Sequence, residues 1–541
     1  MRTILKYTLI IMLVLMTACG EDFVTLTNPN QLTTGSFWKT EEDAVLATTA
    51  IYQALIYDGT FMRKYPWTMD VRADDCYNVT PQSYVMSNLT TYTVGGEELE
   101  QPWECNYVGI WRANQLLDNI ENIEMDGALK TRLIGEAKFL RALYYFDLMV
   151  LYNNAVIYEQ QPQSTDDFLA PLANENWEDD AQEVWDLIYA DLEDAIQGCA
   201  VKSDVDFGHA TKAAAAAMMV RALLQNTDRS TRFSDAIPYL EDILSSADGG
   251  NQLYGEYALV EDYRQNFIEA GENNIESIFE IQYHLFDGLD AQGWIADPQP
   301  NWMKSDGYNK SLAPQPFGWG DIAPSVWIWE KFQEEQTTDG QNDPRMEASF
   351  YFEHPGDTTY KVYGQDQSVL ETMSWATVGN VDGLPLLDQV FIRKYLTEDP
   401  GLDEAWKSGI NRRLIRYAGI LLLYAECLNE TGNQALAAEY IQKVRDRANL
   451  PDRTSEFAAM NRDQLFEQID HERALEFCFE AQRYLDLLRW GYFESQATVN
   501  EILMPRDGEY QNWLPGREYL ALPPTEIERT NGVVVQNPAW N

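Results

Sequence analysis

The chain has 541 residues, 39 basic and 86 acidic side chains, and a net charge of −47 at pH 7. This acidic excess argues against a nucleic acid duplex as partner, because affinity for phosphate comes from Lys and Arg, and against binding to anionic lipid through a basic patch. A hydrophobic fraction of 45% and an aromatic fraction of 12% are enough to bury a large core, which excludes a disordered chain.

The N-terminus has the pattern of a secretory signal peptide, with a positively charged start and an apolar run at 9–16 that is too short to span a bilayer. Cys19 follows small residues at the end of this run and resembles the cysteine of a bacterial lipobox, although Met16 stands where that motif usually has Leu. We predict that residues 1–18 are removed and that acyl chains on Cys19 hold the protein to a membrane. The alternative is an ordinary signal peptide with a cysteine at this place by chance.

Residues 19–35 are expected to form a polar tether that leads into the folded part of the chain. After it, Thr40 can cap a helix together with Asp43 three residues on. Residues 250–400 differ from the rest, since short alternating runs such as 277–281 suggest strands and Pro and Gly break the remainder into loops. The apolar spacing predicts further helices near 107–123, 130–151, 180–197, 208–226, 234–245, 412–431, 434–449 and 462–490.

Five cysteines follow Cys19, so at least one of them is unpaired within the chain. None has a CxxC-type metal spacing, which makes a zinc site improbable. Cys76–Cys105 could be a disulfide that closes a loop, whereas Cys427 and Cys478 lie in apolar helical patterns and are expected to be buried thiols. The four histidines are dispersed, so neither a helical histidine metal motif nor a Ser–His–Asp or Cys–His set can be argued.

Two further patterns concern helix packing. One apolar spacing, which resembles degenerate tetratricopeptide repeats but is also that of any amphipathic hairpin, occurs at Ala236, Leu240 and Ile243 and again at Ala437, Ile441 and Val444. The predicted 462–490 helix carries three pairs of opposite charge at i,i+3, which we interpret as support for the helix and not as catalytic groups. These pairs are Arg473–Glu476, Glu480–Arg483 and Asp486–Arg489.

The order of charged residues in the predicted 462–490 helix resembles the signature of a known family. In order, this helix contains Glu472, Arg473, Glu476, Glu480, Arg483, Asp486, Leu487, Arg489 and Trp490. This order is similar to the signature of SusD/RagB outer-membrane nutrient-binding lipoproteins, roughly E-R-x-x-E-x-x-x-E-x-x-R-x-x-D-L-x-R-W. The resemblance spans the whole mature chain, because further matching segments lie at 37–38, 72–75, 110–114, 136–142, 416–426, 444–448, 519–527 and 536–538.

The resemblance implies a mostly α fold, in which tetratricopeptide-type helix pairs pack against a loop-rich half with a few short strands. It also implies a non-catalytic lipoprotein without a cofactor that faces the cell exterior, binds oligosaccharide or polysaccharide and delivers it to a SusC-like TonB-dependent transporter in the outer membrane. The residues after the tether would form one domain, 36–541, with the helical scaffold at about 36–57, 105–249 and 410–495 and ligand-binding loops at about 58–104 and 250–400.

Aromatic residues gather in two parts of these loop regions. Five of the sixteen Trp lie between 294 and 329, and the stretch 65–107 interleaves Trp and Tyr with Asp, Asn and Gln. Aromatic faces stack on the C–H face of a sugar ring, while the polar side chains bond its hydroxyls. Trp327 and Trp329 have the alternative of beginning a buried strand or helix. The residues that we expect to contact ligand are Trp67, Asp74, Asp75, Tyr77, Asn78, Trp103, Trp294, Trp302, Tyr308 and Trp319.

Other interpretations remain open at this stage. The chain could be a peptide-binding member of the same family, an exported glycosidase that uses two of its many carboxylates, or a structural lid of a transporter. No metal ligand is predicted. The acid content does offer oxygen ligands for calcium, but the chain has no D-x-D-x-D-G loop, and Asp287-Gly288-Leu289-Asp290 is only a weak hint.

Overall fold

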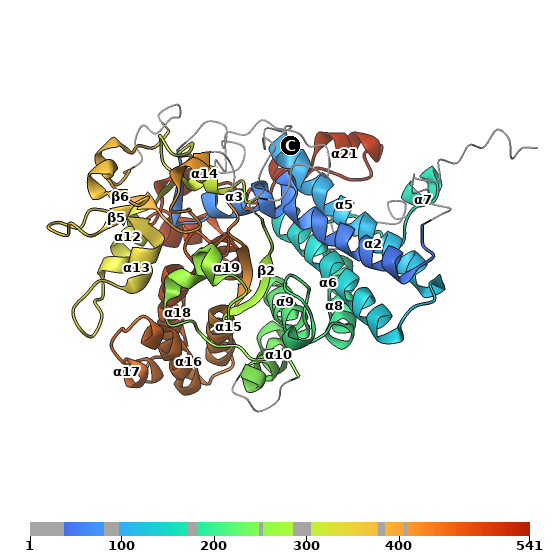
Figure 1. The fold of residues 1–541 in the computed structure, drawn as a ribbon, viewed down its shortest axis with the longest axis horizontal. Helices are drawn as coiled ribbons and strands as arrows, with labels where there is room; N and C mark the ends of the chain where they lie inside the picture. Colours follow the sequence, from blue (N-terminus) through green and yellow to red (C-terminus); the bar gives the residue numbers. More distant parts are fainter. Residues whose placement is uncertain are drawn as a thin grey trace, which may run out of the picture.

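The computed structural model describes residues 37–79, 97–169, 181–247, 253–284, 305–376, 385–404 and 408–540. Helices lie side by side along the right and the lower edge of Figure 1, and a loop-rich region with short strands lies at the upper left. The signal peptide, Cys19 and the tether lie outside the described residues, and among those described no helix is long and apolar enough to cross a membrane.

The N-terminal helices form a continuous stack. Each packs against the next in the chain, α5 on α6, α6 on α8, α8 on α9 and α9 on α10. The close approach of α6 and α8 depends on Gly135 and Gly198, because a Cβ on Gly135 would lie 2.7 Å from the backbone nitrogen of Cys199. These helices are α2 (Glu41–Gln53), α5 (Glu97–Asn119), α6 (Gly127–Tyr152), α8 (Ala181–Gly198), α9 (Lys212–Gln225) and α10 (Arg232–Ala247).

The C-terminal helices continue this stack, since α10 packs against α15 and α15 packs against α16 and α18. The two sets of small and branched residues with repeated spacing are all fully buried in α10 and α16. The helices are α15 (Tyr417–Glu430), α16 (Gln434–Arg447), α17 (Thr454–Ala458), α18 (Arg462–Phe477), α19 (Arg483–Arg489), α20 (Gln496–Thr498) and α21 (Pro524–Arg529).

The remaining elements are short. Within the described ranges, four two-stranded antiparallel sheets pair β1 with β3, β2 with β8, β4 with β7 and β5 with β6. The strands are β1 (Cys76–Asn78), β2 (Ser277–Ile281), β3 (Ile322–Pro324), β4 (Phe350–Tyr351), β5 (Lys361–Val362), β6 (Gln365–Asp366), β7 (Phe391–Ile392) and β8 (Arg412–Arg416). The short helices are α3 (Lys64–Val71), α7 (Thr165–Leu169), α11 (Asn309–Leu312), α12 (Val326–Gln333), α13 (Pro344–Ser349) and α14 (Pro400–Glu404).

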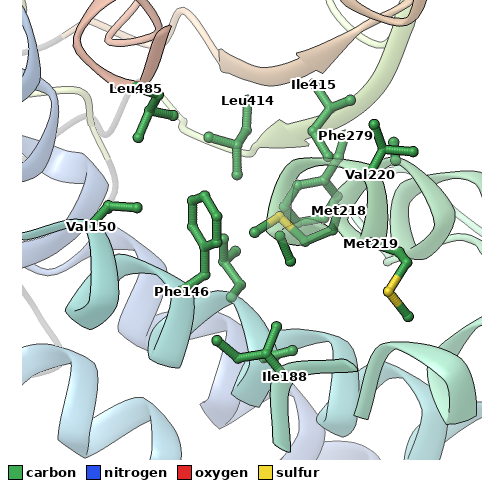
Figure 2. Packing of buried hydrophobic residues seen from close by; sticks show 14 of the residues in the cluster. Phe146, Val150, Ile188, Met218, Met219, Val220, Phe279, Leu414, Ile415 and Leu485 are labelled. Carbon is green, nitrogen blue, oxygen red and sulfur yellow. The ribbon is translucent and has the colours of Figure 1, made fainter. Parts of the chain in front are cut away.

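Two hydrophobic clusters form the core of the described residues. The larger one fills the helical stack, where Phe146 and Val150 of α6 and Ile188 of α8 face Met218 of α9 and Leu485 of α19 (Figure 2). The second cluster lies under the loop-rich half and includes Trp67, Tyr77 and Tyr308. The loop-rich half therefore has its own apolar support and does not rest on the helices alone.

Local sequence signals explain where several helices begin. The predicted cap at Thr40 is confirmed: its hydroxyl accepts a hydrogen bond from the Asp43 backbone nitrogen at 3.2 Å, and the Asp43 carboxylate accepts one from the Thr40 nitrogen at 2.8 Å. Ser325 caps α12 in a similar way, so Trp327 and Trp329 belong to a helix. The expected buried thiols Cys427 and Cys478 are confirmed, whereas Cys76 and Cys105 are both free and do not form the disulfide considered above.

The prediction of a helix from 412 to 431 is wrong in its first turn, because residues 412–416 form strand β8 and the helix starts at Tyr417. The arginines of this strand are buried and reach carboxylates on other segments. Arg412 pairs with Asp306 at 2.7 Å, and Arg413 pairs with Glu280 of the neighbouring strand at 3.2 Å. These partners lie far away in the sequence and favour the extended conformation of 412–416. Local secondary-structure propensity contains no information about them.

The signature segment 462–490 is not one helix but two, α18 and α19, separated by 478–482. Phe479 and Ala481 have φ values of 59° and 58°, which interrupt the helix. Their backbone nitrogens donate to buried carboxylates, Phe479 to Asp75 at 3.0 Å and Ala481 to Asp70 at 2.7 Å. Carboxylates about 400 residues earlier in the chain thus replace the helical acceptors, which no local pattern can reveal.

The charged residues of this segment are also buried instead of forming a surface ladder. Of the three predicted i,i+3 pairs, Asp486–Arg489 is present at 2.8 Å, and the other two are replaced by pairs between segments. Glu476 contacts three arginines, Arg447 at 2.6 Å, Arg416 at 2.9 Å and Arg345 at 3.2 Å. Burial raises the pKa of Glu476, but these guanidinium groups outweigh that effect and hold the pKa well below its usual range.

We predict that Glu476→Ala lowers the free energy of unfolding by about 3–5 kcal/mol, because it leaves three buried arginines without their shared carboxylate. Urea unfolding followed by circular dichroism measures the change. Glu456→Ala is the matched control, since Glu456 is exposed and pairs only with Arg453 at 2.6 Å, and its loss should cost less than about 1 kcal/mol. Equal effects of the two substitutions would contradict the structural role given to Glu476.

The burial of Asp75 predicts how the free energy of unfolding depends on pH. Its burial, together with the neighbouring Asp70 and Asp74 carboxylates, raises the pKa of Asp75 to about 8. The folded protein binds the Asp75 proton more tightly than the unfolded chain, in which the pKa is about 4. This difference stabilises the fold fully below pH 4, and the contribution is lost as the pH rises to about 8.

The Asp75→Asn variant keeps an acceptor for Phe479 and cannot ionise. Between pH 5 and 8 its free energy of unfolding should fall less steeply than that of the wild type, by up to about 1.4 kcal/mol per pH unit. Chemical unfolding at several pH values measures both slopes, and parallel slopes would show that Asp75 is not protonated in the folded protein.

Candidate functional site

Part of the first aromatic-rich window meets the second window in the structure, because β1 pairs with β3 of the segment 305–325. Four described stretches begin or end next to this segment, where hydrogen bonds hold their terminal residues. The Val79 nitrogen donates to the Asp321 carbonyl at 2.9 Å, the Ala376 nitrogen to the Gly320 carbonyl at 3.0 Å, the Asp306 nitrogen to the Ser408 carbonyl at 2.8 Å, and the Ser305 hydroxyl to the His284 carbonyl at 3.3 Å. Residues that flank 80–96, 285–304, 377–384 and 405–407 therefore lie together.

Trp319 is at the centre of this region and is half-buried. Its backbone nitrogen donates to the Lys310 carbonyl at 2.8 Å, and the Lys310 ammonium lies 5.3 Å from the centre of its indole ring. The neighbouring Gly318 packs so tightly that a Cβ there would lie 2.5 Å from Ala313. The backbone around Trp319 is therefore tightly packed, and the side chain on it is partly exposed.

Tyr308 is fully buried in the structure, and its contact with ligand stays a prediction. Its hydroxyl donates to Asp70 at 2.8 Å, and the Arg412 guanidinium lies 5.0 Å from its ring centre. Burial raises the pKa of Asp70 to about 6, although Tyr308 and Arg412 lower it. This group links the segment that carries Trp319 to the break between α18 and α19, so Tyr308 supports the region from below and does not contact solvent.

Asp74 and Asp75 are also buried, and their carboxylates bind groups of the protein itself. The Asp74 carboxylate binds Arg483 at 2.6 Å and Arg506 at 2.9 Å. One Asp75 oxygen accepts from the Phe479 backbone, as described above. The sequence could not separate these carboxylates from ligand contacts, because their partners lie more than 400 residues away.

The other early candidates are buried as well. Trp67 is 4% exposed and belongs to the second core cluster. Tyr77 and Asn78 form part of β1 and pair with Ala323 and Ile322 of β3. Their burial arises because β1 inserts beneath the segment 305–325, so they position it. Trp294 and Trp302 lie outside the described residues, and their contact with ligand stays a prediction.

Trp103 lies away from this segment, in the middle of the helical half. It is 2% exposed and lines one side of a pocket along α5. The same pocket is lined by Tyr107 and Trp111 of α5, which follow Trp103 at spacings of four and eight residues. This helical spacing of large aromatics is a sequence signal that could have identified Trp111, which was not among the expected ligand contacts.

The described residues contain no group of three or more His, Cys, Asp or Glu side chains placed to hold a metal ion. The weak calcium hint at 287–290 lies outside the part of the chain that the structure describes. The region around Trp319 contains a partly exposed aromatic side chain. This chemistry suits recognition by contact.

The chain matches two family models, the SusD family over residues 275–540 and a family described as "Starch-binding associating with outer membrane" over residues 27–224. A SusD-like protein, P38, from Formosa agariphila is 27% identical over 508 residues, which cover 90% of each chain.

Solved structures show the same fold. A SusD superfamily protein from Bacteroides vulgatus superposes with a TM-score of 0.70 at 24% identity, over 93% of this chain and 100% of that one. Surface glycan-binding protein A from Bacteroides thetaiotaomicron, in complex with laminarihexaose, has a TM-score of 0.68 at 22% identity, over 92% of this chain and 100% of that one. These matches confirm the predicted mostly helical, SusD-like fold. The chain therefore belongs to the SusD/RagB family, and its N-terminal part matches the model described as starch-binding and associating with the outer membrane.

Proposed function

We propose that the protein is a cell-surface lipoprotein that binds an oligosaccharide or polysaccharide nutrient around Trp319 and delivers it to a SusC-like TonB-dependent transporter. The observation that carries this proposal is that β1 of the first aromatic-rich window pairs with the rigid segment 305–325 of the second, on which Trp319 is partly exposed. A pyranose ring can stack on the indole while its hydroxyls bond to polar groups around it.

The net negative charge of the chain favours a neutral glycan over an acidic one. With 86 acidic and 39 basic residues, the protein repels polyanions such as sulfated or uronic polysaccharides. The Lys310 ammonium near Trp319 already faces the indole ring. Neutral glycans therefore fit best, and laminarihexaose, which a structurally similar protein binds, is the first ligand to test.

The rigid support around Trp319 fits a receptor that hands its ligand on. Tyr308, Asp70 and Arg412 hold the segment from below, so little conformational entropy is lost when ligand binds. Binding through one aromatic face and a few hydrogen bonds gives moderate affinity, which permits release to a transporter. A peptide ligand would not need a Trp-rich window, so the glycan is favoured over the peptide alternative.

We predict that Trp319→Ala weakens binding of laminarihexaose, or of the neutral glycan that binds best in a panel, by at least about tenfold, or about 1.4 kcal/mol. The loss of a stacking face is the physical reason, so Trp319→Phe should recover part of the affinity. Isothermal titration calorimetry gives the dissociation constants.

Phe207→Ala is the control for this experiment, because Phe207 is 73% exposed and lies outside the region. Its affinity should equal that of the wild type. If Trp319→Ala binds as tightly as Phe207→Ala, the region around Trp319 is not the binding site.

The lipid anchor makes a separate prediction. Cells that produce Cys19→Ala should release the protein from the membrane fraction, because the acyl chains that would hold it there have no other attachment point. Fractionation followed by immunoblotting and labelling with a fatty acid analogue measures both localisation and acylation. A variant that stays in the membrane fraction after an alkaline wash would show that another contact anchors the chain.

A further inference from the structure

A second aromatic pocket lies in the helical half, between α5, the chain around α7 and α21. Its volume is about 590 Å³, which falls in the range of small-molecule sites. Its walls include Trp103, Tyr107 and Trp111 of α5, Tyr158, and Phe168 of α7. In Figure 1 these three helices lie at the right of the molecule, and no lining residue belongs to the segment 305–325.

The aromatic rings of this pocket form one connected wall. The ring centres of Trp103 and Tyr107 are 5.0 Å apart, those of Tyr107 and Tyr158 are 6.1 Å apart, and Tyr158 stacks on Phe168 at 5.5 Å with an angle of 16°. Tyr107 is fixed further, because its hydroxyl donates to the Val156 carbonyl at 3.0 Å. The wall is thus held in place before any ligand binds.

Trp111 differs from the other rings, since 40% of it is exposed. A large indole left open to solvent beside a pocket carries a cost in apolar exposure that a bound ligand would remove. The neighbouring Arg112 is not available to a ligand, because it donates to the Ala50 carbonyl and the Tyr57 hydroxyl, each at 2.6 Å. Trp111 is therefore the accessible stacking face of the pocket.

The polar groups at the pocket favour an uncharged ligand with hydroxyls. Glu526 pairs with Arg529 at 3.0 Å, so their charges cancel. Asn114 is occupied, since it donates to the Tyr158 carbonyl and accepts from Arg141, both at 2.7 Å. Gln115 and Glu104 line the pocket, and neither side chain has a hydrogen-bond partner among the described residues.

We propose that this pocket is a second carbohydrate subsite, which binds pyranose units of a neutral glycan with Trp111 as the stacking face and Gln115 and Glu104 as partners of hydroxyl groups. The inference rests on the proposed glycan-binding function and extends it to a site on different helices. Glu104 is exposed and Gln115 is half-buried, so both can bond to sugar hydroxyls while a pyranose ring stacks on Trp111. Two subsites on one chain would retain a polysaccharide more strongly than either alone.

The test is calorimetric titration of the full mature protein with laminarihexaose and with maltohexaose, in the wild type and in three variants. Trp111→Ala should lower the stoichiometry for the bound hexasaccharide from two to one and leave the remaining site unchanged. Trp111→Phe should keep two sites, and Phe207→Ala, which removes an exposed aromatic ring elsewhere, should behave as the wild type. Thermal unfolding checks that each variant is folded.

Trp319→Ala separates the two proposals. If Trp319→Ala alone abolishes all binding and Trp111→Ala changes nothing, the second subsite is overturned and the proposed function stands. If Trp111→Ala alone abolishes binding, the pocket is the glycan site and the placement at Trp319 fails. Absence of binding of both hexasaccharides to the wild type overturns the subsite. Normal sugar binding by Trp111→Ala together with loss of co-purification with a β-barrel would also overturn it, and would make the pocket a protein-docking surface.

Discussion

The structure depends on a buried network of arginines and carboxylates that joins segments far apart in the sequence. Glu476 of α18 contacts Arg345, Arg416 and Arg447, which come from α13, β8 and α16. A buried charge is tolerated only when it is paired and hydrogen-bonded, and each of these groups compensates the others. Loss of one partner would leave the rest unpaired in a low dielectric, so the network specifies how the helices and the loop-rich half assemble.

The same network of buried charges is connected to the region around Trp319. Asp74 binds Arg483 and Arg506, while Asp75 holds the backbone where α18 ends. From there Asp70 and Tyr308 connect to the segment 305–325. The carboxylates that follow α3 are therefore elements of rigidity, and the aromatic surface above them can remain fixed in the absence of ligand. Rigid support of a small contact area is what allows moderate affinity with little entropic cost.

Several residues that were expected to contact ligand are buried for one common reason: an aromatic or acidic residue has the same composition signal whether it is buried or exposed. Trp67, Tyr77 and Tyr308 all lie in the core, whereas Trp111 is an exposed ring. The difference is set by which segment covers each ring. Burial depends on contacts between residues 200 to 400 positions apart, and single-sequence patterns carry no information on those contacts.

Local spacing and one ordered set of charged residues were enough to predict the family, the mostly helical class, the approximate place of the long helices and the cap at Thr40. The burial of this set, its division between two helices and the strand at Arg412–Arg416 became evident from contacts in the folded chain. The physical reason is that a charged side chain on a helix is stable either in water or beside an opposite charge brought by another segment. Only the folded chain shows which of the two applies.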